Sequence, residues 1–167
     1  FVPILVLAFV HPFSAEEAVP AQEILDLIAA NEPVYYDGVL ISGDLDISSL
    51  PAAKIPESLI LVNCTVPNAS FAGAIFAKDA VFWGTAFGNA SFEKSSFLGR
   101  ADFSNASIGP ASFSGCTFSQ PAFFNGAIFK DNVSFEDAAF GRDAFFNAAS
   151  FLGRADFNYS HFDSYSY

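Results

Sequence analysis

Between residues 71 and 167 a large side chain recurs every five or six positions, and this spacing constrains the fold more than any other feature of the chain. The large residue is Phe at seventeen of nineteen positions, with Ile108 and Tyr167 as the exceptions. The residue two places earlier is Ala in thirteen cases, among them Ala74 and Ala101. An amphipathic helix would return its apolar residues at every third or fourth position, so this spacing indicates a solenoid of short stacked units instead.

The paired small and large residues predict which side chains point inward. In an extended backbone, residues two positions apart point to the same side. The small residue and the Phe therefore both face the interior, and the residue between them faces outward. The remaining positions must turn the chain, and they hold turn-forming pairs such as Gly88-Asn89, Gly109-Pro110 and Asn125-Gly126. A small partner is needed because a second large side chain beside each Phe would exceed the packing density of a protein interior.

The six-residue steps indicate how many sides one coil has. Counting the unit that ends at Phe71 as zero, the extra residue follows units 1, 5, 9, 11, 13 and 15. With four sides per coil, every insertion falls on one corner or on the corner opposite it, whereas three or five sides would scatter the insertions. We therefore expect four sides per coil and 20 to 22 residues in each coil.

Several runs of sequence carry a family resemblance. They are Asn-Ala-Ser-Phe at 68–71 and 89–92, Phe-Leu-Gly-Arg-Ala-Asp-Phe at 97–103 and 151–157, and Asn-Gly-Ala-Ile-Phe at 125–129. These runs resemble the Phe-centred pentapeptide-repeat proteins, in the variant that alternates five-residue and six-residue spacing. The resemblance covers roughly residues 39–167 and implies an all-β fold, a right-handed quadrilateral parallel β-helix. Residues 39–50 are also similar to the entry segment that precedes such repeats in secreted or envelope-associated members.

The residues before the regular repeat divide into three predicted segments. Residues 1–15 are an apolar run followed by a plausible cleavage region, which predicts a signal or leader segment whose basic start is missing. A buried strand and a shortened membrane anchor are the alternatives. We expect a short N-terminal capping helix within residues 16–33, because residues 20–31 begin with Pro and have one apolar side. Irregular entry coils over residues 34–70 then lead into the regular β-helix over residues 71–167.

The net charge of −11 is concentrated before the regular repeat. Residues 1–70 contain nine acids and one base, a balance of −8, whereas residues 71–167 contain nine acids and six bases, a balance of −3. Some cytoplasmic pentapeptide-repeat proteins imitate DNA and bind topoisomerases, and DNA carries one charge per ~1.7 Å of its axis. The repeat falls far short of that density, so nucleic-acid mimicry is the weaker interpretation.

The outward residues can be sorted by side. One side, here called the serine side, carries Ser70, Ser91, Ser112, Ser134 and Asp156. The aromatic side lies two sides further round and carries Val81, Asp102, Phe123, Phe145 and Ser166. Contiguous exposed aromatic residues mark interaction surfaces, so we predict that Trp83, Val81, Phe123 and Phe145 bind a protein partner or a second copy of the chain. The alternative is that these rings only shield the strands or pack against an N-terminal segment.

The two cysteines occupy small inward positions. Ten steps, or two and a half coils, separate the units of Cys64 and Cys116. This places the thiols on opposite sides and ~12 Å apart along the axis, beyond the ~7 Å between Cα atoms that a disulfide allows. We therefore predict two buried and unpaired thiols.

Six sequons make the chain a candidate for N-glycosylation if it is exported. They begin at Asn63, Asn68, Asn89, Asn105, Asn132 and Asn158. The repeat itself generates Asn-Ala-Ser, with the Asn at a corner and the Ser facing outward. Their number alone therefore says little about modification.

No catalytic, cofactor or metal site can be assembled from the residue pattern. The two histidines, His11 and His161, lie near opposite ends of the chain, and no phosphate-binding loop, zinc spacing or calcium-binding loop is present. We expect a non-catalytic, secreted or envelope-associated scaffold without a cofactor, which binds a protein, a glycan or a copy of itself. The alternatives are a cytoplasmic acidic DNA mimic that regulates a topoisomerase and the soluble repeat part of a larger membrane protein. Membrane contact would then come only through missing terminal segments.

Overall fold

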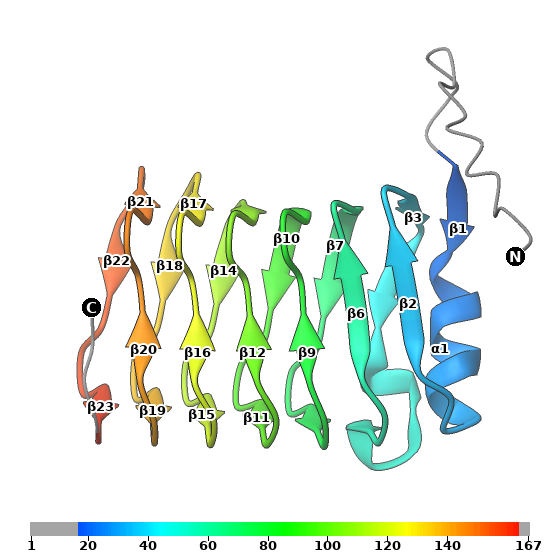
Figure 1. Ribbon diagram of the computed structural model, residues 1–167, viewed down its shortest axis with the longest axis horizontal. Coiled ribbons are helices and arrows are strands. Elements are labelled where there is room, and N and C mark those ends of the chain that lie inside the picture. The colour runs from blue at the N-terminus through cyan, green and yellow to red at the C-terminus, as the bar shows by residue number, and fades with distance from the viewer. Residues whose placement is uncertain (1–16, 164–167) are drawn as a thin grey trace, which may run out of the picture.

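The computed structural model describes residues 17–163, which form a parallel β-solenoid of about seven turns with one short helix near its N-terminal end (Figure 1). The predicted export signal over residues 1–15 lies outside the described residues. The predicted fold, a four-sided parallel β-helix with a helical cap, is confirmed.

The cap is helix α1 (Ala21–Ala29), which follows directly after Pro20. Its first turn carries Glu23, whose negative charge favours the N-terminal end of a helix. The apolar side of the helix is buried and consists of Ala21, Ile24, Leu25 and Ile28. This side packs on strands β2 (Val34–Asp37) and β4 (Asp44–Asp46), so the helix covers the first coil of the solenoid.

Short parallel strands form three sheets along the four sides of the solenoid. The 11-stranded sheet covers two adjacent sides and contains β1 (Ala18–Pro20), β3 (Leu40–Ser42), β4, β7 (Thr65–Ser70), β10 (Ala86–Ser91), β13 (Ser107–Ile108), β14 (Ala111–Ser112), β17 (Ile128–Phe129), β18 (Val133–Ser134), β21 (Ser150–Phe151) and β22 (Ala155–Asp156). A 6-stranded sheet contains β5 (Lys54–Ile55), β8 (Ile75–Phe76), β11 (Ser96–Phe97), β15 (Thr117–Phe118), β19 (Ala139–Phe140) and β23 (His161–Phe162). The aromatic side is the other 6-stranded sheet, formed by β2, β6 (Leu59–Val62), β9 (Ala80–Val81), β12 (Ala101–Asp102), β16 (Ala122–Phe123) and β20 (Ala144–Phe145). Two short 3-10 helices, Ile47–Ser49 and Pro51–Ala53, lie in the first full coil.

The strand register confirms four units per coil. Each strand pairs with the strand of the same side one coil later. Ser96 of β11 aligns with Thr117 of β15, 21 residues on, and Thr117 aligns with Ala139 of β19, 22 residues on. The first coils are longer, since Val34 aligns with Leu59, 25 residues on.

The interior consists of columns of stacked phenylalanine rings. Phe113, for example, lies between Phe92 and Phe135, with 4.9 Å between ring centroids on each side and nearly parallel planes. Rings of the neighbouring sides meet it edge-on, as Phe103 does at 90°. Both arrangements are favourable for aromatic pairs because the ring edge is positive and the ring face negative.

The corners of the solenoid are of two kinds. The corners after the serine side and the aromatic side are tight turns, in which an amide donates to the carbonyl of the large residue three positions earlier, as Cys116 does to Phe113 and Ala127 to Phe124. Their third residue has positive φ, as at Gly115 with φ 66°. An added residue would break this hydrogen bond, which explains why every six-residue step falls at the other two corners.

At one place the expected turn is absent. The sequence predicts a turn at Gly88-Asn89, and this prediction is wrong, because both residues lie within β10, which continues onto the serine side. A Cβ atom at Gly88 would overlap the carbonyl oxygen of Pro67 in the preceding coil. The missing side chain therefore allows the strands to run straight through this corner. As a result, the two adjoining sides share one sheet.

Candidate binding surfaces

The aromatic side presents one outward residue from each of six successive coils. In register, this outward row consists of Tyr35, Ile60, Val81, Asp102, Phe123 and Phe145. Sequence reasoning missed Tyr35 and Ile60, because the entry coils do not follow the five-residue rule. The available signal was that β2 and β6 carry apolar residues on both faces of the strand.

The two phenylalanines of this row, Phe123 and Phe145, stack on each other. Their ring centroids are 5.0 Å apart and their planes differ by 9°. Phe123 and Phe145 are half-buried, however, and not fully exposed as the sequence analysis assumed. One reason is that the Arg100 guanidinium lies over the Phe123 ring, 4.9 Å from its centroid. This is a favourable cation–π contact that covers part of the ring.

The single charged residue of the row is neutralised within its own side. Asp102 is only 3% exposed. Its carboxylate accepts hydrogen bonds from the Arg100 guanidinium and, at 2.9 Å, from the Ser104 amide. The repeated Arg-Ala-Asp run forms the same arrangement at Arg154 and Asp156, with 2.9 Å between Nη2 and Oδ2. A buried carboxylate with these partners does not repel an apolar ligand as a free charge would.

The structure does not bring all four predicted surface residues together. Trp83 lies at a corner and is 42% exposed, beside Val81. One complete coil, that of Asp102 and Ser104, separates it from Phe123. The predicted surface therefore has an aromatic pair toward one end and Val81 with Trp83 toward the other.

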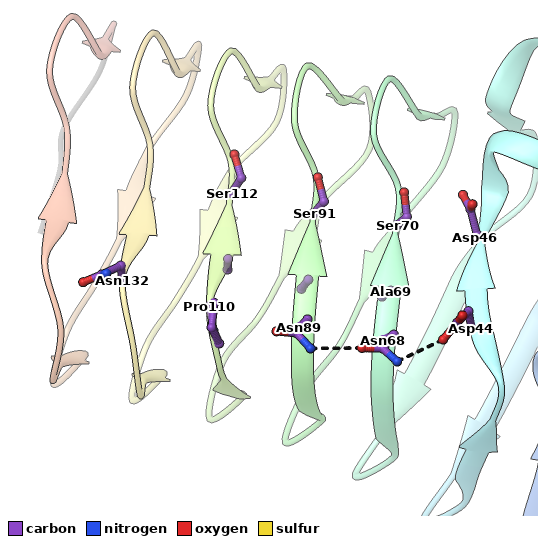
Figure 2. A pocket seen from close by; sticks show the side chains of 12 residues that line it. Asp44, Asp46, Asn68, Ala69, Ser70, Asn89, Ser91, Pro110, Ser112 and Asn132 are labelled. Atoms are coloured by element: carbon purple, nitrogen blue, oxygen red, sulfur yellow. Dashed lines mark hydrogen bonds between the residues drawn. The ribbon is translucent and has the colours of Figure 1, made fainter.

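The serine side contains a groove that the sequence analysis did not predict (Figure 2). Its volume is about 560 Å³. The groove is lined by Asp44, Asp46, Asn68, Ala69, Ser70, Asn89, Ala90, Ser91, Pro110, Ala111, Ser112 and Asn132. The sequence placed the serines on one side, but it did not place Asn68 and Asn89 beside them, which lie in the continuous strands β7 and β10.

Figure 2 shows the two walls of this groove. One wall is the serine row, which begins with Asp46 and continues through Ser70, Ser91 and Ser112. The opposite wall, here called the amide row, consists of Asp44, Asn68, Asn89, Pro110 and Asn132. Its first three residues are linked by hydrogen bonds between their side chains. Asn89 Nδ2 donates to Asn68 Oδ1 at 3.0 Å, and Asn68 Nδ2 donates to Asp44 Oδ1 at 2.9 Å.

The six predicted glycosylation residues are all exposed. Some of their side chains already have partners, such as Asn63, whose Nδ2 donates to Asp37 Oδ1 at 3.1 Å. Asn68 and Asn89 belong to the amide row. Nothing in the structure tests whether a glycan is attached, so these sites stay predictions.

Both cysteines are buried, and neither forms a disulfide within residues 17–163, as predicted. Cys64 adjoins β7 and Cys116 adjoins β15, on opposite sides of the solenoid. The Cys116 thiol donates to the carbonyl of Phe92 at 2.8 Å. Burial raises the pKa of Cys116 to about 12, because the interior disfavours the thiolate.

Within residues 17–163, no group of three or more His, Cys, Asp or Glu residues is arranged to hold a metal ion. In the same part of the chain, no helix has the length and apolar character needed to cross a membrane.

Comparison with known families gives one match. The family model described as Pentapeptide repeats (9 copies) matches residues 82–128, 108–149 and 124–166, which together span half of the chain. The chain belongs to the pentapeptide-repeat family. As in the family pattern, the solenoid is built from short units with an inward small residue and an inward Phe. Neither the curated proteins nor the solved structures gave a match.

Proposed function

We propose that this pentapeptide-repeat protein is a non-catalytic, exported or envelope-associated scaffold whose aromatic side binds a partner protein. The observation that carries the proposal is the outward row of six residues on that side, of which only Asp102 is charged. Apart from Asp102, whose buried carboxylate is paired with Arg100, the row offers apolar contacts from Tyr35 to Phe145. Solvent-facing strands usually alternate apolar and polar residues, so an apolar outer row supports a binding role.

The dimensions of the row favour a partner protein over a second copy of the chain. Six coils at a spacing of ~4.8 Å give a row ~24 Å long. A single narrow side of that length offers less than the ~800 Å² per partner that stable interfaces bury. A partner that also contacts the corner at Trp83 would reach a larger area than two flat sides pressed together.

Three features support export. Residues 1–15 have the composition of a signal segment, residues 39–50 are similar to the entry segment of secreted relatives, and every sequon asparagine is exposed. An exported protein would not meet a cytoplasmic topoisomerase, and the repeat has too little net charge to imitate DNA. Sequencing of the mature N-terminus tests this part of the proposal. A retained N-terminal segment would contradict cleavage and revive the cytoplasmic alternative.

The binding role is tested with the double variant Phe123→Ser/Phe145→Ser. Purified protein immobilised on beads is used to capture a partner from an envelope extract. The matched control is Ile128→Ser, because Ile128 is also an outward apolar residue but lies on β17, on a different side. Far-ultraviolet circular dichroism checks that each variant is folded.

We expect the double variant to lose at least ~90% of the captured partner, about 1.4 kcal/mol or more, while Ile128→Ser retains it. Equal capture by wild type and the double variant would refute the aromatic side as the binding surface. Unfolding of the double variant would show instead that the two rings belong to the core. Sedimentation of the purified chain separately reports self-association, which this proposal expects to be weak.

A further inference from the structure

We propose that the groove on the serine side binds a linear, uncharged oligosaccharide. This side lies opposite the aromatic side, so the inference does not depend on the protein partner proposed above.

The shape of the groove fits a chain-like ligand. The walls follow five successive coils, from the row of Asp44 to the row of Asn132, a length of ~19 Å at ~4.8 Å per coil. The volume of about 560 Å³ lies within the ~300–1,000 Å³ typical of small-molecule sites. The floor is formed by the strands at Ala69, Ala90 and Ala111, whose side chains face the interior, so no side chain rises between the two walls there.

Around Pro110, the amide row contains hydrogen-bonding groups that have no partner among the described residues. Its chain of hydrogen bonds stops at Pro110, which has no side-chain donor or acceptor. Asn89 Oδ1 therefore has no hydrogen-bond partner among residues 17–163. Asn132 Nδ2 likewise has no hydrogen-bond partner among these residues. The only hydrogen bond of the Asn132 side chain there is at Oδ1, which accepts from the Arg154 backbone amide at 2.9 Å. A free acceptor and a free donor thus lie one coil to either side of Pro110.

In the serine row, the hydroxyl groups nearer helix α1 are also available for hydrogen bonds with a ligand. The hydroxyl groups of Ser70 and Ser91 are half-buried and have no hydrogen-bond partner within the described part of the chain. By contrast, Ser134, beyond the groove, accepts from Ser114 at 2.7 Å. Hydroxyls and carboxamides that line the two walls of a groove without a side chain between them suit a ligand with hydroxyls along its edges.

Charge argues against an anionic ligand. Among the described residues, no Lys or Arg lines the groove, and Asp44 and Asp46 stand at one end. A smaller hollow continues the groove past Ser112 and includes Arg154, but that guanidinium is paired with Asp156 at 2.9 Å. Nucleic acids and acidic polysaccharides would therefore meet repulsion without a compensating cation.

The sheet geometry argues against an extended peptide. A peptide that binds by strand addition needs a free strand edge. The strands below the groove, such as β7, β10 and β14, are paired on both edges with strands of the adjacent coils. A ligand here would meet side chains, and apart from Asp44 and Asp46 at one end their polar groups are the uncharged hydroxyls and amides that can bind sugar hydroxyls.

The test uses three uncharged hexasaccharides with different linkages, cellohexaose, laminarihexaose and maltohexaose, and a hexagalacturonate as the anionic comparison. Binding is measured by calorimetry, and the site is mapped on the wild-type protein by amide chemical shifts. The groove variant is Ser91→Leu, which removes a free hydroxyl and fills the groove. The matched control is Ser96→Leu, at the equivalent outward position of β11 in the same coil.

We expect at least one uncharged hexasaccharide to bind with a Kd below ~1 mM and to shift the amides around Ser91 and Asn89. Ser91→Leu should weaken that binding at least ~10-fold, and Ser96→Leu less than ~2-fold. The proposal is overturned if none of the three binds wild type, if hexagalacturonate binds more tightly, or if the shifts map to another side. The shift mapping keeps the test decisive even if Ser91→Leu fails to fold.

The outcome is separable from that of the protein-binding proposal. The double variant Phe123→Ser/Phe145→Ser should bind the hexasaccharide as wild type does, because its substitutions lie on the opposite side. Ser91→Leu should likewise still capture the partner protein.

Discussion

Replacing a phenylalanine in the middle of the stack should cost far more stability than replacing one near its C-terminal end. Phe113 is 0% exposed and contacts four rings. It stacks at 4.9 Å on Phe92 and on Phe135, and meets Phe103 and Phe124 edge-on at 5.2 and 5.6 Å. In a solenoid each coil contacts only its neighbours, so the loss of this ring weakens the coupling on both sides of one coil.

Phe157 provides the comparison, because it occupies the same inward position two coils later. It is half-buried and stacks on Phe135 at 4.8 Å, with Phe146 and Phe151 edge-on at 5.8 and 6.0 Å. Phe→Ala in a core costs about 3–5 kcal/mol, and the four close ring contacts place Phe113→Ala at about 5 kcal/mol. A half-buried ring loses about half of its transfer free energy, so we expect about 2 kcal/mol for Phe157→Ala.

The assay is urea unfolding at 25 °C, followed by circular dichroism and by the fluorescence of Trp83, the only tryptophan. Phe113→Ala should move both signals to lower urea. Phe157→Ala should move the circular dichroism signal more than the fluorescence, because Trp83 lies several coils away. As an internal control, Phe113→Leu should recover most of the loss, since it leaves a smaller cavity. Equal destabilisation by the two alanine variants, within ~1 kcal/mol, would refute the nearest-neighbour picture of this core.

Three further predictions concern the cysteines and the corner glycines. Cys64 and Cys116 should not react with a thiol reagent in native protein at pH 8, and both should react after unfolding without reductant; a titre of zero would indicate a disulfide. The pKa of Cys116 is raised from 9.0 to about 12, so between these pH values the folded thiol keeps its proton while the unfolded thiol ionises. The free energy of unfolding should therefore fall as pH rises from 9 to 12, and Cys116→Ala should lessen this fall. A Cβ atom on Gly109 would overlap the carbonyl oxygen of Gly88, whereas Gly73, at φ 70°, has open space around it. In thermal or urea unfolding, we expect Gly109→Ala to cost about 3 kcal/mol and Gly73→Ala about 1 kcal/mol. The reverse order would contradict the close approach of the coils.

Much of the architecture could be predicted from the residue pattern. The small-to-large spacing assigned Phe71, Phe92 and Phe113 to one interior column, and the structure stacks them in that order. The same counting placed Cys64 and Cys116 on opposite sides. These predictions succeed because a strand alternates its side chains with a fixed period, so position in the sequence translates directly into direction in space.

The shape and exposure of the outer sides could not be predicted from the residue pattern, because they depend on contacts between coils. Gly88-Asn89 has the composition of a turn, yet both residues lie within a continuous strand that pairs with the preceding coil, and Asn89 lines the groove beside Ser91. Likewise, only the register joins Tyr35 to the aromatic side, and only the folded position of Arg100 explains why Phe123 is half-buried. The repeat by itself determined the number of sides and the content of the core, because both follow from local periodicity. The depth and exposure of each side were decided by the tertiary structure, because they depend on how closely neighbouring coils and their long side chains approach.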